Sequence, residues 1–478
     1  MGELQAIIND ENKMKKLKIS GKDLRSIGIR DDRTLSITKN TLEKYYKHTR
    51  KKDALDMIKK VMKHPQKFQK HPELGHVAKA IKQPEKSSKQ TVSLSETKPY
   101  RIYGKHQIEQ GAHQQMETAM SLPISVHGAL MPDAHQGYGL PIGGVVATKN
   151  QVIPYGVGMD IGCRMCLSIY NLDHSIIDTQ PHKLQNILNE NTRFGRSEFQ
   201  ERKEHPIIDR EEFNEIPFLK SLQKKAYDQL GSSGHGNHFV DVGILEIKEV
   251  IDEQGIAPGI YFAILSHSGS RGAGAEIARH YTKVASQLCE LPKGAKSLAW
   301  LELTSQEGQE YWKAMNWAGD YSAANHHMIH QKLAKALGED PLGIIENHHN
   351  FAWKEALSED GEELIVHRKG ATPAKKGALG IIPGSMASPA YLVRGKGTPE
   401  SLNSAAHGAG RKMSRGEAKR QFTSKALNDY LTTKGVLLMG GGTDESPMAY
   451  KDINEVMQHQ EEMIDILATF NPKIVRMG

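Results

Sequence analysis

Residues 51–65, in the N-terminal part of the chain, include apolar residues at helical spacing. Within KKDALDMIKKVMKHP they recur with the period of an amphipathic helix, and Pro65 marks its end. The apolar positions on this helix face are Leu55, Ile58, Val61 and Met62. Residues 1–82 are therefore predicted to form a small, basic and mainly helical N-terminal extension.

The polar stretch KQPEKSSKQTVSLSETKP has little to bury, which predicts a linker over residues 83–98. In residues 99–478, apolar runs such as GIYFAILSHSG and EELIVHRKG are typical of buried strands. Three longer segments predict helices: AEIARHYTKVASQL, QEYWKAMNWAGDYSAANHHMIHQKLAKAL and DINEVMQHQEEMIDILATF. The expected fold is a mixed α/β (α+β) body with a central β core flanked by helices.

Charge separates the two parts of the chain. The formal net charge is +7, yet Met1 to Tyr100 alone hold 24 Lys or Arg against 12 Asp or Glu. The remaining residues carry a small acidic excess. This division predicts a segment that faces a polyanion, attached to a near-neutral body. A merely solvated helical face is the alternative.

Composition restricts the class of protein. The chain has 478 residues, 38% of them hydrophobic and 25% charged, as in globular proteins. No run of about 18 apolar residues occurs, so no membrane partner is expected. Three cysteines, Cys163, Cys166 and Cys289, are too few for a disulfide framework. They fit a reducing, cytoplasmic location.

Polar residues that bind metals stand among glycines beside apolar runs, where scaffolds present functional groups. YGVGMDIGCRMC contains Asp160 and Cys163, and three other blocks contain His238, His267 and His349. Carboxylate, thiolate and imidazole together suit a transition metal. Each residue also has a structural interpretation, as a turn former, a packing residue or a hydrogen-bonded histidine. Spacing alone leaves both interpretations open.

Three further blocks have the composition of phosphate-binding loops. HSGSRG, PGSMASP and HGAGRKMSR combine Gly, Ser and Arg, which supply backbone N–H groups and guanidinium forks for phosphate oxygens. None of them is a Walker motif, so an ordinary P-loop NTPase is disfavoured.

Taken in order, the blocks resemble the signatures of RtcB-type RNA ligases from about Tyr100 to Gly478. They are MPDAHQGYGLPIGGVVAT, GVGMDIGCRM, GHGNHF, LSHSGSRG, HHNF, RKGATPAKKGALGIIPGSM, AAHGAGRKMSR and SPMAYKDINEVM. The resemblance implies an enzyme of tRNA splicing or RNA repair. It would join RNA 3′-phosphate or 2′,3′-cyclic phosphate ends to 5′-hydroxyl ends, using GTP and Mn²⁺. An archease-type activator is a candidate partner, and a monomer or weak homodimer is expected.

Carried over residue by residue, the resemblance implies His407 as the residue that receives GMP before an RNA 3′-diphosphate-guanosine forms. Cys163 would bridge two Mn²⁺ ions, one shared with His267 and His349, the other with Asp160 and His238. The implied nucleotide contacts, besides His407, are Asn237, Asp241, Ser385, Gly408, Ala409, Gly410 and Tyr450. The implied contacts to RNA phosphates are Arg271 and Arg411.

Three positions depart from the family pattern. Arg164 stands in DIGCRM where the family has Gly, and it either contacts a phosphate or points away. Asp241 stands where the family has a Glu that binds nucleotide. Met477 stands where a Lys reaches the guanine, with Arg476 beside it as a candidate substitute.

Two other functions are compatible with parts of this pattern. A specialised paralogue would guanylylate or repair particular damaged RNA ends, or DNA 3′-phosphate ends, and would keep His407 and the metal ligands. A non-enzymatic RNA-binding protein would not need these residues, so their presence disfavours it.

Overall fold

The computed structural model describes residues 17–29, 32–81, 90–201, 203–357 and 361–478. The chain divides into two compact units, Met1–Lys89 and Gln90–Gly478. The linker expected over 83–98 lies partly outside the described residues, so the domain boundaries stay a prediction. Within the described ranges, no helix combines the length and the apolar character that crossing a membrane requires.

The N-terminal unit is a set of helices around an apolar core of its own. Its helices are α2 (Gly21–Ser26), α3 (Asp32–Tyr45), α4 (Lys51–Lys63), α5 (Pro65–Phe68) and α6 (Gly75–Ile81). α2 begins with a capping box, in which the side chains of Ser20 and Asp23 each accept a hydrogen bond from the other's backbone N–H. Ile58 and Val61 of α4 are fully buried in this core, as their helical spacing predicted, whereas Leu55 and Met62 of the same predicted face are only partly buried and Ala54 is buried as well.

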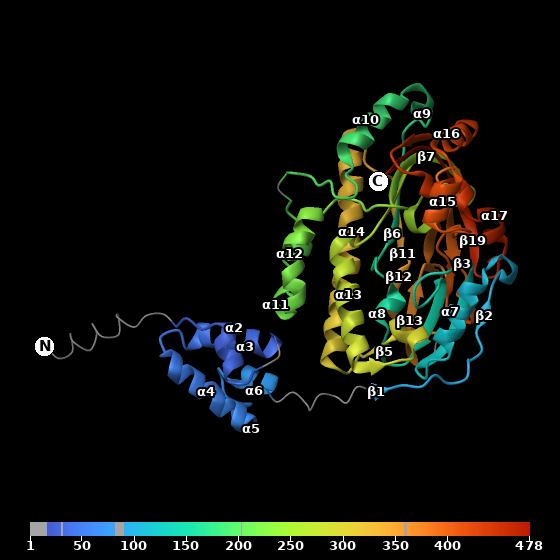
Figure 1. Cartoon of the computed structure of the whole chain (residues 1–478). Coiled ribbons are helices and arrows are strands. Elements are labelled where there is room, and N and C mark those ends of the chain that lie inside the picture. Colours follow the sequence, from blue (N-terminus) through green and yellow to red (C-terminus); the bar gives the residue numbers. More distant parts are fainter. Residues whose placement is uncertain (1–16, 30–31, 82–89, 202, 358–360) are drawn as a thin grey trace, which may run out of the picture. The chain divides into compact units, whose positions relative to one another are not determined.

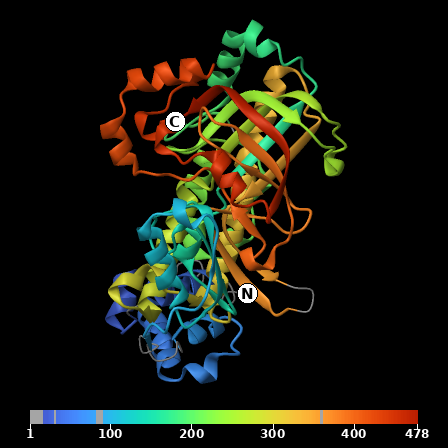
Figure 2. The same ribbon diagram turned by 90° about the vertical axis from the view of Figure 1, so that its right-hand side faces the viewer.

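The larger unit is built around an eight-stranded sheet with the main order β11-β6-β8-β7-β19-β16-β15, in which β18 pairs with β19. The strands are β6 (Arg164–Tyr170), β7 (Phe239–Ile247), β8 (Gly259–Ser268), β11 (Gly343–His348), β15 (Leu379–Ile382), β16 (Ala390–Gly395), β18 (Leu437–Met439) and β19 (Ile464–Met477). All neighbours on the main path run antiparallel. The strands curl together (Figure 2), and the Asn347 side chain of β11 accepts a hydrogen bond from the Ile381 N–H of β15 at 2.8 Å.

Both faces of this sheet are buried, which explains the nearly continuous apolar runs of its strands. Leu167, Leu265 and Phe470 belong to one apolar cluster, whereas Tyr170 and Phe262 belong to a second that also includes residues of α10 and α14. Figure 1 shows α14 as a long helix beside α13. The helices of this unit are α7 (Gln110–Met120), α8 (Pro154–Val157), α9 (Ile176–Thr179), α10 (Pro181–Asn191), α11 (Glu212–Glu215), α12 (Pro217–Gln229), α13 (Arg271–Leu288), α14 (Gln306–Leu337), α15 (Arg415–Gln421), α16 (Ser424–Thr433) and α17 (Ile453–Gln458).

A second sheet has five strands in the order β12-β13-β4-β3-β2. They are β2 (Arg101–Ile102), β3 (Ser125–His135), β4 (Ile142–Thr148), β12 (Asn350–Ala356) and β13 (Glu363–Lys369). Short two-stranded pairs complete the unit: β1 (Gln90–Thr91) with β9 (Cys289–Glu290), β5 (Gln151–Val152) with β10 (Leu301–Glu302), and β14 (Ala371–Pro373) with β17 (Ser404–Ala406). The mixed α/β architecture expected from the sequence is thereby confirmed.

The segment DINEVMQHQEEMIDILATF is not the single long helix that was predicted. α17 ends at Gln458, and β19 begins at Ile464. Buried Ile464, Leu467 and Ala468 have the spacing of a helix face, which misled the prediction. β19 lies between β7 and β16 and is hydrogen-bonded to both. This pairing satisfies its backbone on both sides, and tertiary context outweighs the local pattern.

Candidate functional site

One edge of the eight-stranded sheet gathers residues from distant parts of the chain. Because neighbouring strands alternate in direction, the ends of β11 and β8 lie at the same edge as the starts of β6 and β7. Arg164, for example, pairs with both His348 and Ser268. The predicted ligands at or just beyond these strand ends therefore meet: Cys163, His238, His267 and His349.

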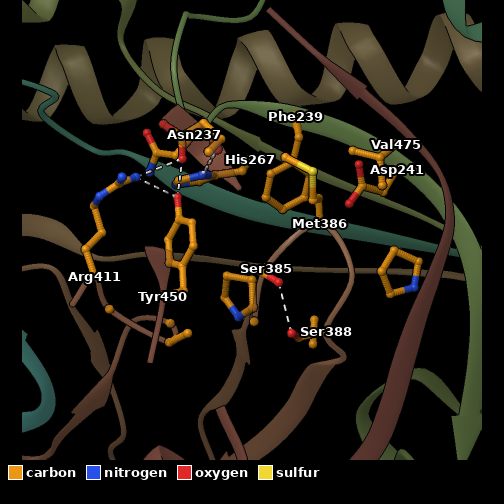
Figure 3. Close-up of a pocket in the computed structure, with 18 of the residues that line it drawn as sticks. Asn237, Phe239, Asp241, His267, Ser385, Met386, Ser388, Arg411, Tyr450 and Val475 are labelled. Atoms are coloured by element: carbon orange, nitrogen blue, oxygen red, sulfur yellow. Dashed lines mark hydrogen bonds and ion pairs between the residues drawn. The ribbon is translucent and has the colours of Figure 1, made fainter. Parts of the chain in front are cut away.

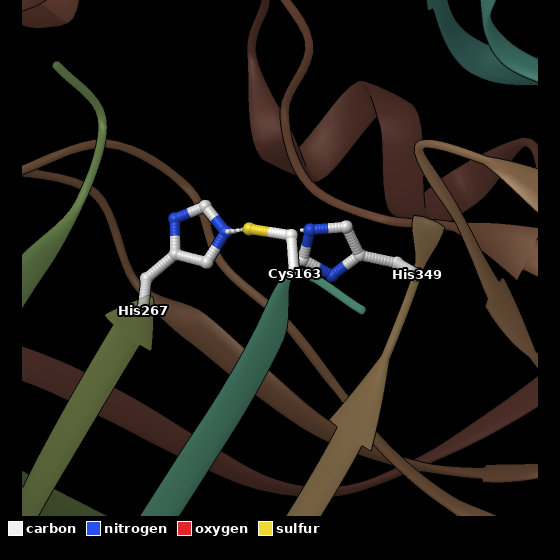
Figure 4. Close-up of side chains that lie close together, drawn as sticks. All are labelled: Cys163, His267 and His349. Atoms are coloured by element: carbon white, nitrogen blue, oxygen red, sulfur yellow. Dashed lines mark hydrogen bonds between the residues drawn. The ribbon is translucent and has the colours of Figure 1, made fainter. Parts of the chain in front are cut away.

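Cys163, His267 and His349 converge at this edge, one from each of three neighbouring strand ends (Figure 4). The Cys163 Sγ lies 3.1 Å from His267 Nε2, and that nitrogen lies 3.3 Å from His349 Nε2. His267 donates its Nδ1–H to the Asn237 carbonyl at 2.9 Å. This hydrogen bond leaves a lone pair on His267 Nε2, facing the sulfur and the second imidazole.

A second group of ligand atoms shares the same sulfur. His238 Nε2 lies 3.0 Å from Asp160 Oδ2 and 3.5 Å from Cys163 Sγ. Asn350 fixes the turn that carries Asp160 and Cys163. Its carbonyl accepts a hydrogen bond from the Gly162 N–H at 2.7 Å, and its side-chain amide donates to the Asp160 carbonyl at 3.2 Å. Cys163 therefore lies between two sets of metal-binding side chains.

The protonation states of these side chains suit metal binding. Burial lowers the pKa of His267 to about 3 and the pKa of His349 well below its usual range. Burial would raise the pKa of Asp160, but its hydrogen bond and charge interaction with His238 outweigh burial and lower it. Burial, with Asp160 nearby, raises the pKa of the Cys163 thiol well above its usual range, and a bound cation would release that proton.

The donor set fits divalent transition metals. It offers one sulfur, three imidazoles and one carboxylate within two overlapping groups. The Nδ1 atoms of His238 and His349 are buried without a hydrogen-bond partner among the described residues. The packing of the described residues therefore leaves these imidazole nitrogens unsatisfied.

His407 lies beside this ligand cluster and is held by a buried carboxylate. Its ring centroid is 5.2 Å from that of His349. Asp133, whose side chain is fully buried, accepts hydrogen bonds from His407 Nδ1–H at 2.5 Å and from the His407 backbone N–H at 3.1 Å. Gly410 has a φ of +71°, and a Cβ there would come within 2.1 Å of the Asp133 carbonyl, so this turn needs glycine. The Asp133 carboxylate accepts from Nδ1–H, so it favours the imidazole tautomer in which Nε2 carries the lone pair.

His407 lines a pocket, and Figure 3 shows other side chains that line it. Its lining includes every residue that the resemblance assigned to nucleotide: Asn237, Asp241, Ser385, His407, Gly408, Ala409, Gly410 and Tyr450. A neighbouring cavity is lined by Asp160, Cys163, His238 and His349, and it shares Asn237, His267 and His407 with the pocket. His407 therefore stands where the two cavities meet.

Comparison with known proteins accounts for this arrangement. A family model described as tRNA-splicing ligase RtcB matches residues 115–218 and 213–478. The chain belongs to the RtcB family. RNA-splicing ligase RtcB1 of Escherichia coli strain ATCC 25922 is 31% identical over 407 residues, which cover 78% of this chain and 95% of the relative. The tRNA-splicing ligase RtcB of Nanoarchaeum equitans is 30% identical over 461 residues, covering 80% and 95%.

Within this RtcB-family site, Arg411 and Tyr450 form one hydrogen-bonded group (Figure 3). Arg411 donates to the Tyr450 hydroxyl at 3.2 Å and to the Glu445 carboxylate at 3.1 Å, and its guanidinium lies 5.0 Å from the Tyr450 ring centroid. The Tyr450 hydroxyl also donates to Glu445, and burial raises its pKa. Arg411 thus lines the pocket already paired, and its predicted contact with RNA stays a prediction.

The far wall of the pocket is apolar around one buried acid. Phe239, Met386, Val475 and Met477 line it together with Asp241. Asp241 is 4% exposed, and its Oδ1 has no hydrogen-bond partner among the described residues. Burial raises the pKa of Asp241 well above its usual range. Burial therefore favours the neutral carboxyl group over the carboxylate in the pocket wall.

Arg476 does not replace the lysine expected at Met477. Successive residues of a strand point to opposite faces, and Val475 and Met477 both face the pocket. Arg476 therefore lies on the other face, 5.6 Å from the Phe194 ring centroid.

The other two arginines singled out from the sequence are also engaged. Arg164 points toward β11, where its Nη1 lies 2.8 Å from Glu346 Oε1, and Glu346 also pairs with His327 of α14 at 3.2 Å. The departure at Arg164 therefore adds an ion pair beside α14. Arg271 begins α13 with a φ of +57° and donates to the Gly195 carbonyl at 2.5 Å. Its predicted RNA contact stays a prediction.

Two residues of the site were missed by sequence reasoning. Asp133 lies in the block MPDAHQGYGLPIGGVVAT, for which the resemblance named no site residue. Lys369 lies near the end of the run EELIVHRKG and lines the cavity that also holds Asp160 and Cys163. It donates to the Tyr138 and Leu140 carbonyls at 2.5 and 3.0 Å. Burial lowers the pKa of Lys369 to about 7. Both residues could have been found as charged residues beside or within apolar runs. A buried charge is costly unless it is paired or serves a function.

Proposed function

We propose that the chain is a GTP- and Mn²⁺-dependent RNA ligase of tRNA splicing or RNA repair. It joins RNA 3′-phosphate or 2′,3′-cyclic phosphate ends to 5′-hydroxyl ends. The observation that carries the proposal is the place of His407, whose Nδ1 is held by Asp133 and which lines both the pocket and the cavity of the ligand cluster. Membership of a family whose relatives are named RNA-splicing ligases supports this reaction class.

In the first step, His407 Nε2 attacks the α-phosphorus of GTP. A nitrogen–phosphorus bond forms, the bond from the α-phosphorus to the bridging oxygen breaks, and pyrophosphate leaves. Positive charge develops on the imidazole, and the Asp133 carboxylate that accepts its Nδ1–H offsets that charge. Asp133 also holds the tautomer in which Nε2 is the nucleophile.

In the second step, an oxygen of the RNA 3′-phosphate attacks the guanylyl phosphorus, which frees His407 and forms RNA 3′-diphosphate-guanosine. The 5′-hydroxyl then attacks the 3′-phosphorus, and GMP leaves. A neutral Lys369, which donates two N–H groups to Tyr138 and Leu140, keeps a lone pair for the hydroxyl proton. A 2′,3′-cyclic end is first hydrolysed to the 3′-phosphate.

The metal centre supplies electrostatic stabilisation in this scheme. Two Mn²⁺ ions held by the ligand cluster would neutralise charge on the phosphate oxygens during transfer. The ligands would be Asp160, Cys163, His238, His267 and His349, with Cys163 shared.

The pocket also supports recognition of guanine. Asn237, Ser385 and Tyr450 are the proposed nucleotide contacts, as the resemblance implies. A neutral Asp241 both donates and accepts a hydrogen bond, which matches the adjacent N1–H donor and O6 acceptor of guanine. This pairing would supply a contact to the guanine base in a pocket where the family pattern has a Lys at position 477.

The direct test is incubation with α-labelled GTP, Mn²⁺ and RNA that carries a 3′-phosphate and a 5′-hydroxyl. We expect a ligated product and GMP linked to the wild-type protein, and no linked GMP on His407→Ala. Asp133→Asn should slow labelling by about 100-fold or more, because the tautomer and the charge are both lost. Absence of label on wild-type protein with Mn²⁺ confirmed bound would overturn the mechanism.

A further inference from the structure

A dense basic surface lies in the N-terminal unit, before the first residue that the RtcB family model matches. Between Lys44 and Lys63 the chain has eight Lys or Arg and two Asp. All eight basic side chains belong to exposed residues. The fold of this unit therefore concentrates positive charge over the α3–α4 connection and α4.

The geometry of α4 arranges part of this charge in a row. At about 100° per residue, Lys52, Lys59 and Lys63 lie within about 40° of one another around the helix axis, and the row is about 16 Å long. The opposite face carries Ala54 and Ile58, which are fully buried in the core of the unit. Core packing thus directs the row toward solvent.

Within the described part of the chain, most of these cations have no carboxylate partner. Lys51 pairs with Asp23 at 2.6 Å, and Lys59 pairs with Asp56 at 3.0 Å. Among the described residues, no carboxylate pairs with five others: Lys47, Arg50, Lys52, Lys60 and Lys63. This excess of positive charge is available to an anionic partner.

An exposed aromatic side chain stands at the same place. Tyr45 ends α3 with 46% of its surface exposed, and Lys44 Nζ lies 4.8 Å from its ring centroid. A flat ring among cations suits single-stranded nucleic acid, since bases stack on the ring while phosphates meet the charges. Within the described part of this unit Tyr45 is the one large apolar side chain that is exposed, so no apolar face favours a lipid surface.

We propose that a surface around α4 binds single-stranded RNA. This α4 basic surface consists of Tyr45, Lys47, Arg50, Lys52, Lys60 and Lys63. The basic side chains displace counterions from the RNA phosphates, and Tyr45 stacks on a base. The choice of RNA as the polyanion rests on the proposed ligase function. The surface would hold a substrate strand on the enzyme independently of the chemistry at its ends.

The test uses the full-length chain without GTP and a fluorescent single-stranded RNA with hydroxyl groups at both ends, which cannot be ligated. Anisotropy gives its affinity between 50 and 200 mM salt. The variant Lys52→Gln/Lys60→Gln/Lys63→Gln should bind about tenfold more weakly, and the slope of log affinity against log salt should fall by about 2. Tyr45→Ala should weaken binding about tenfold with an unchanged slope.

The matched control is Lys293→Gln/Lys296→Gln/Lys335→Gln, three exposed lysines of the larger unit, which should leave affinity and slope unchanged. An unchanged slope in the α4 triple variant, or an equal loss in the control, overturns the proposal. The proposal is also overturned if the α4 triple variant loses binding to polyglutamate but still binds RNA, because that result points to an acidic protein as the partner. Labelling of the wild-type protein by GTP is measured separately. If labelling fails while the α4 triple variant still reduces the salt slope of RNA binding, the ligase function is rejected and the RNA-binding surface is retained.

Discussion

Two cysteines three residues apart in the sequence each lie beside a pair of histidines, and the two groups differ in how the imidazole nitrogens are hydrogen-bonded. Cys163 meets His267 and His349, and Cys166 meets His326 and His330. In both groups the ligand atoms lie within 4.8 Å of one another and the residues are buried. Proximity and burial therefore do not distinguish the two groups, and hydrogen bonding does.

Around Cys166, serines satisfy every imidazole nitrogen. Ser168 Oγ lies 2.6 Å from His330 Nδ1, and Ser266 Oγ lies 2.8 Å from His330 Nε2 and 2.7 Å from His326 Nδ1. His326 Nε2 lies 3.2 Å from the Ser268 carbonyl, which accepts only. The donors are therefore ordered along one chain: Ser168 to His330, His330 to Ser266, Ser266 to His326, and His326 to the carbonyl.

This comparison teaches that a metal site needs lone pairs that the protein leaves unused. The serine chain consumes all four imidazole nitrogens near Cys166, and it ties α14 to β6 and β8. Near Cys163, the Nε2 atoms of His267 and His349 face each other, and His349 Nδ1 has no partner among the described residues. Of these two groups, we therefore expect the Cys163 group, and not the Cys166 group, to bind a metal ion.

The largest difference between the groups should appear in metal affinity. Cys163→Ala should weaken Mn²⁺ binding at least about 100-fold, because both metal positions lose their shared ligand. Cys166→Ala is the matched control, since it removes a buried thiol from the neighbouring group, and it should keep the wild-type affinity. Isothermal titration of metal-free protein measures both. Equal losses in the two variants would erase the distinction.

Much of the Cys163 group could be predicted because each ligand sits in a recognisable block. The sequence could not show how strand pairing brings the ligands together, nor which nitrogens the backbone and serines consume. His326 and His330 are one helical turn apart and look like ordinary core residues of a long helix. The orientation of Met477 was hidden because the sequence analysis predicted no strand after Phe470, and side-chain alternation applies only to a strand.

The serine chain should also appear in the pH dependence of stability. Burial lowers the pKa of His330 from 6.5 to about 4. Between those pH values the unfolded chain binds a proton that the folded chain does not, so stability present above pH 6.5 is lost as pH falls toward 4. The loss is about 3 kcal/mol at most. His330→Gln should flatten this dependence in urea unfolding, whereas His48→Gln, at an exposed position, should not.

Ser266→Ala gives the smallest and most selective effect. It leaves His330 Nε2–H without its acceptor and His326 Nδ1 without its donor, at a cost of about 2 kcal/mol in unfolding free energy. Ser268→Ala is the control on the same strand. Its buried hydroxyl has no partner among the described residues, and its carbonyl is retained, so urea unfolding should change little. Mn²⁺ affinity should stay at the wild-type value in both variants. If Ser266→Ala costs no more than Ser268→Ala, the ordered chain does not stabilise the fold, and hydrogen bonding is not what separates the two cysteines.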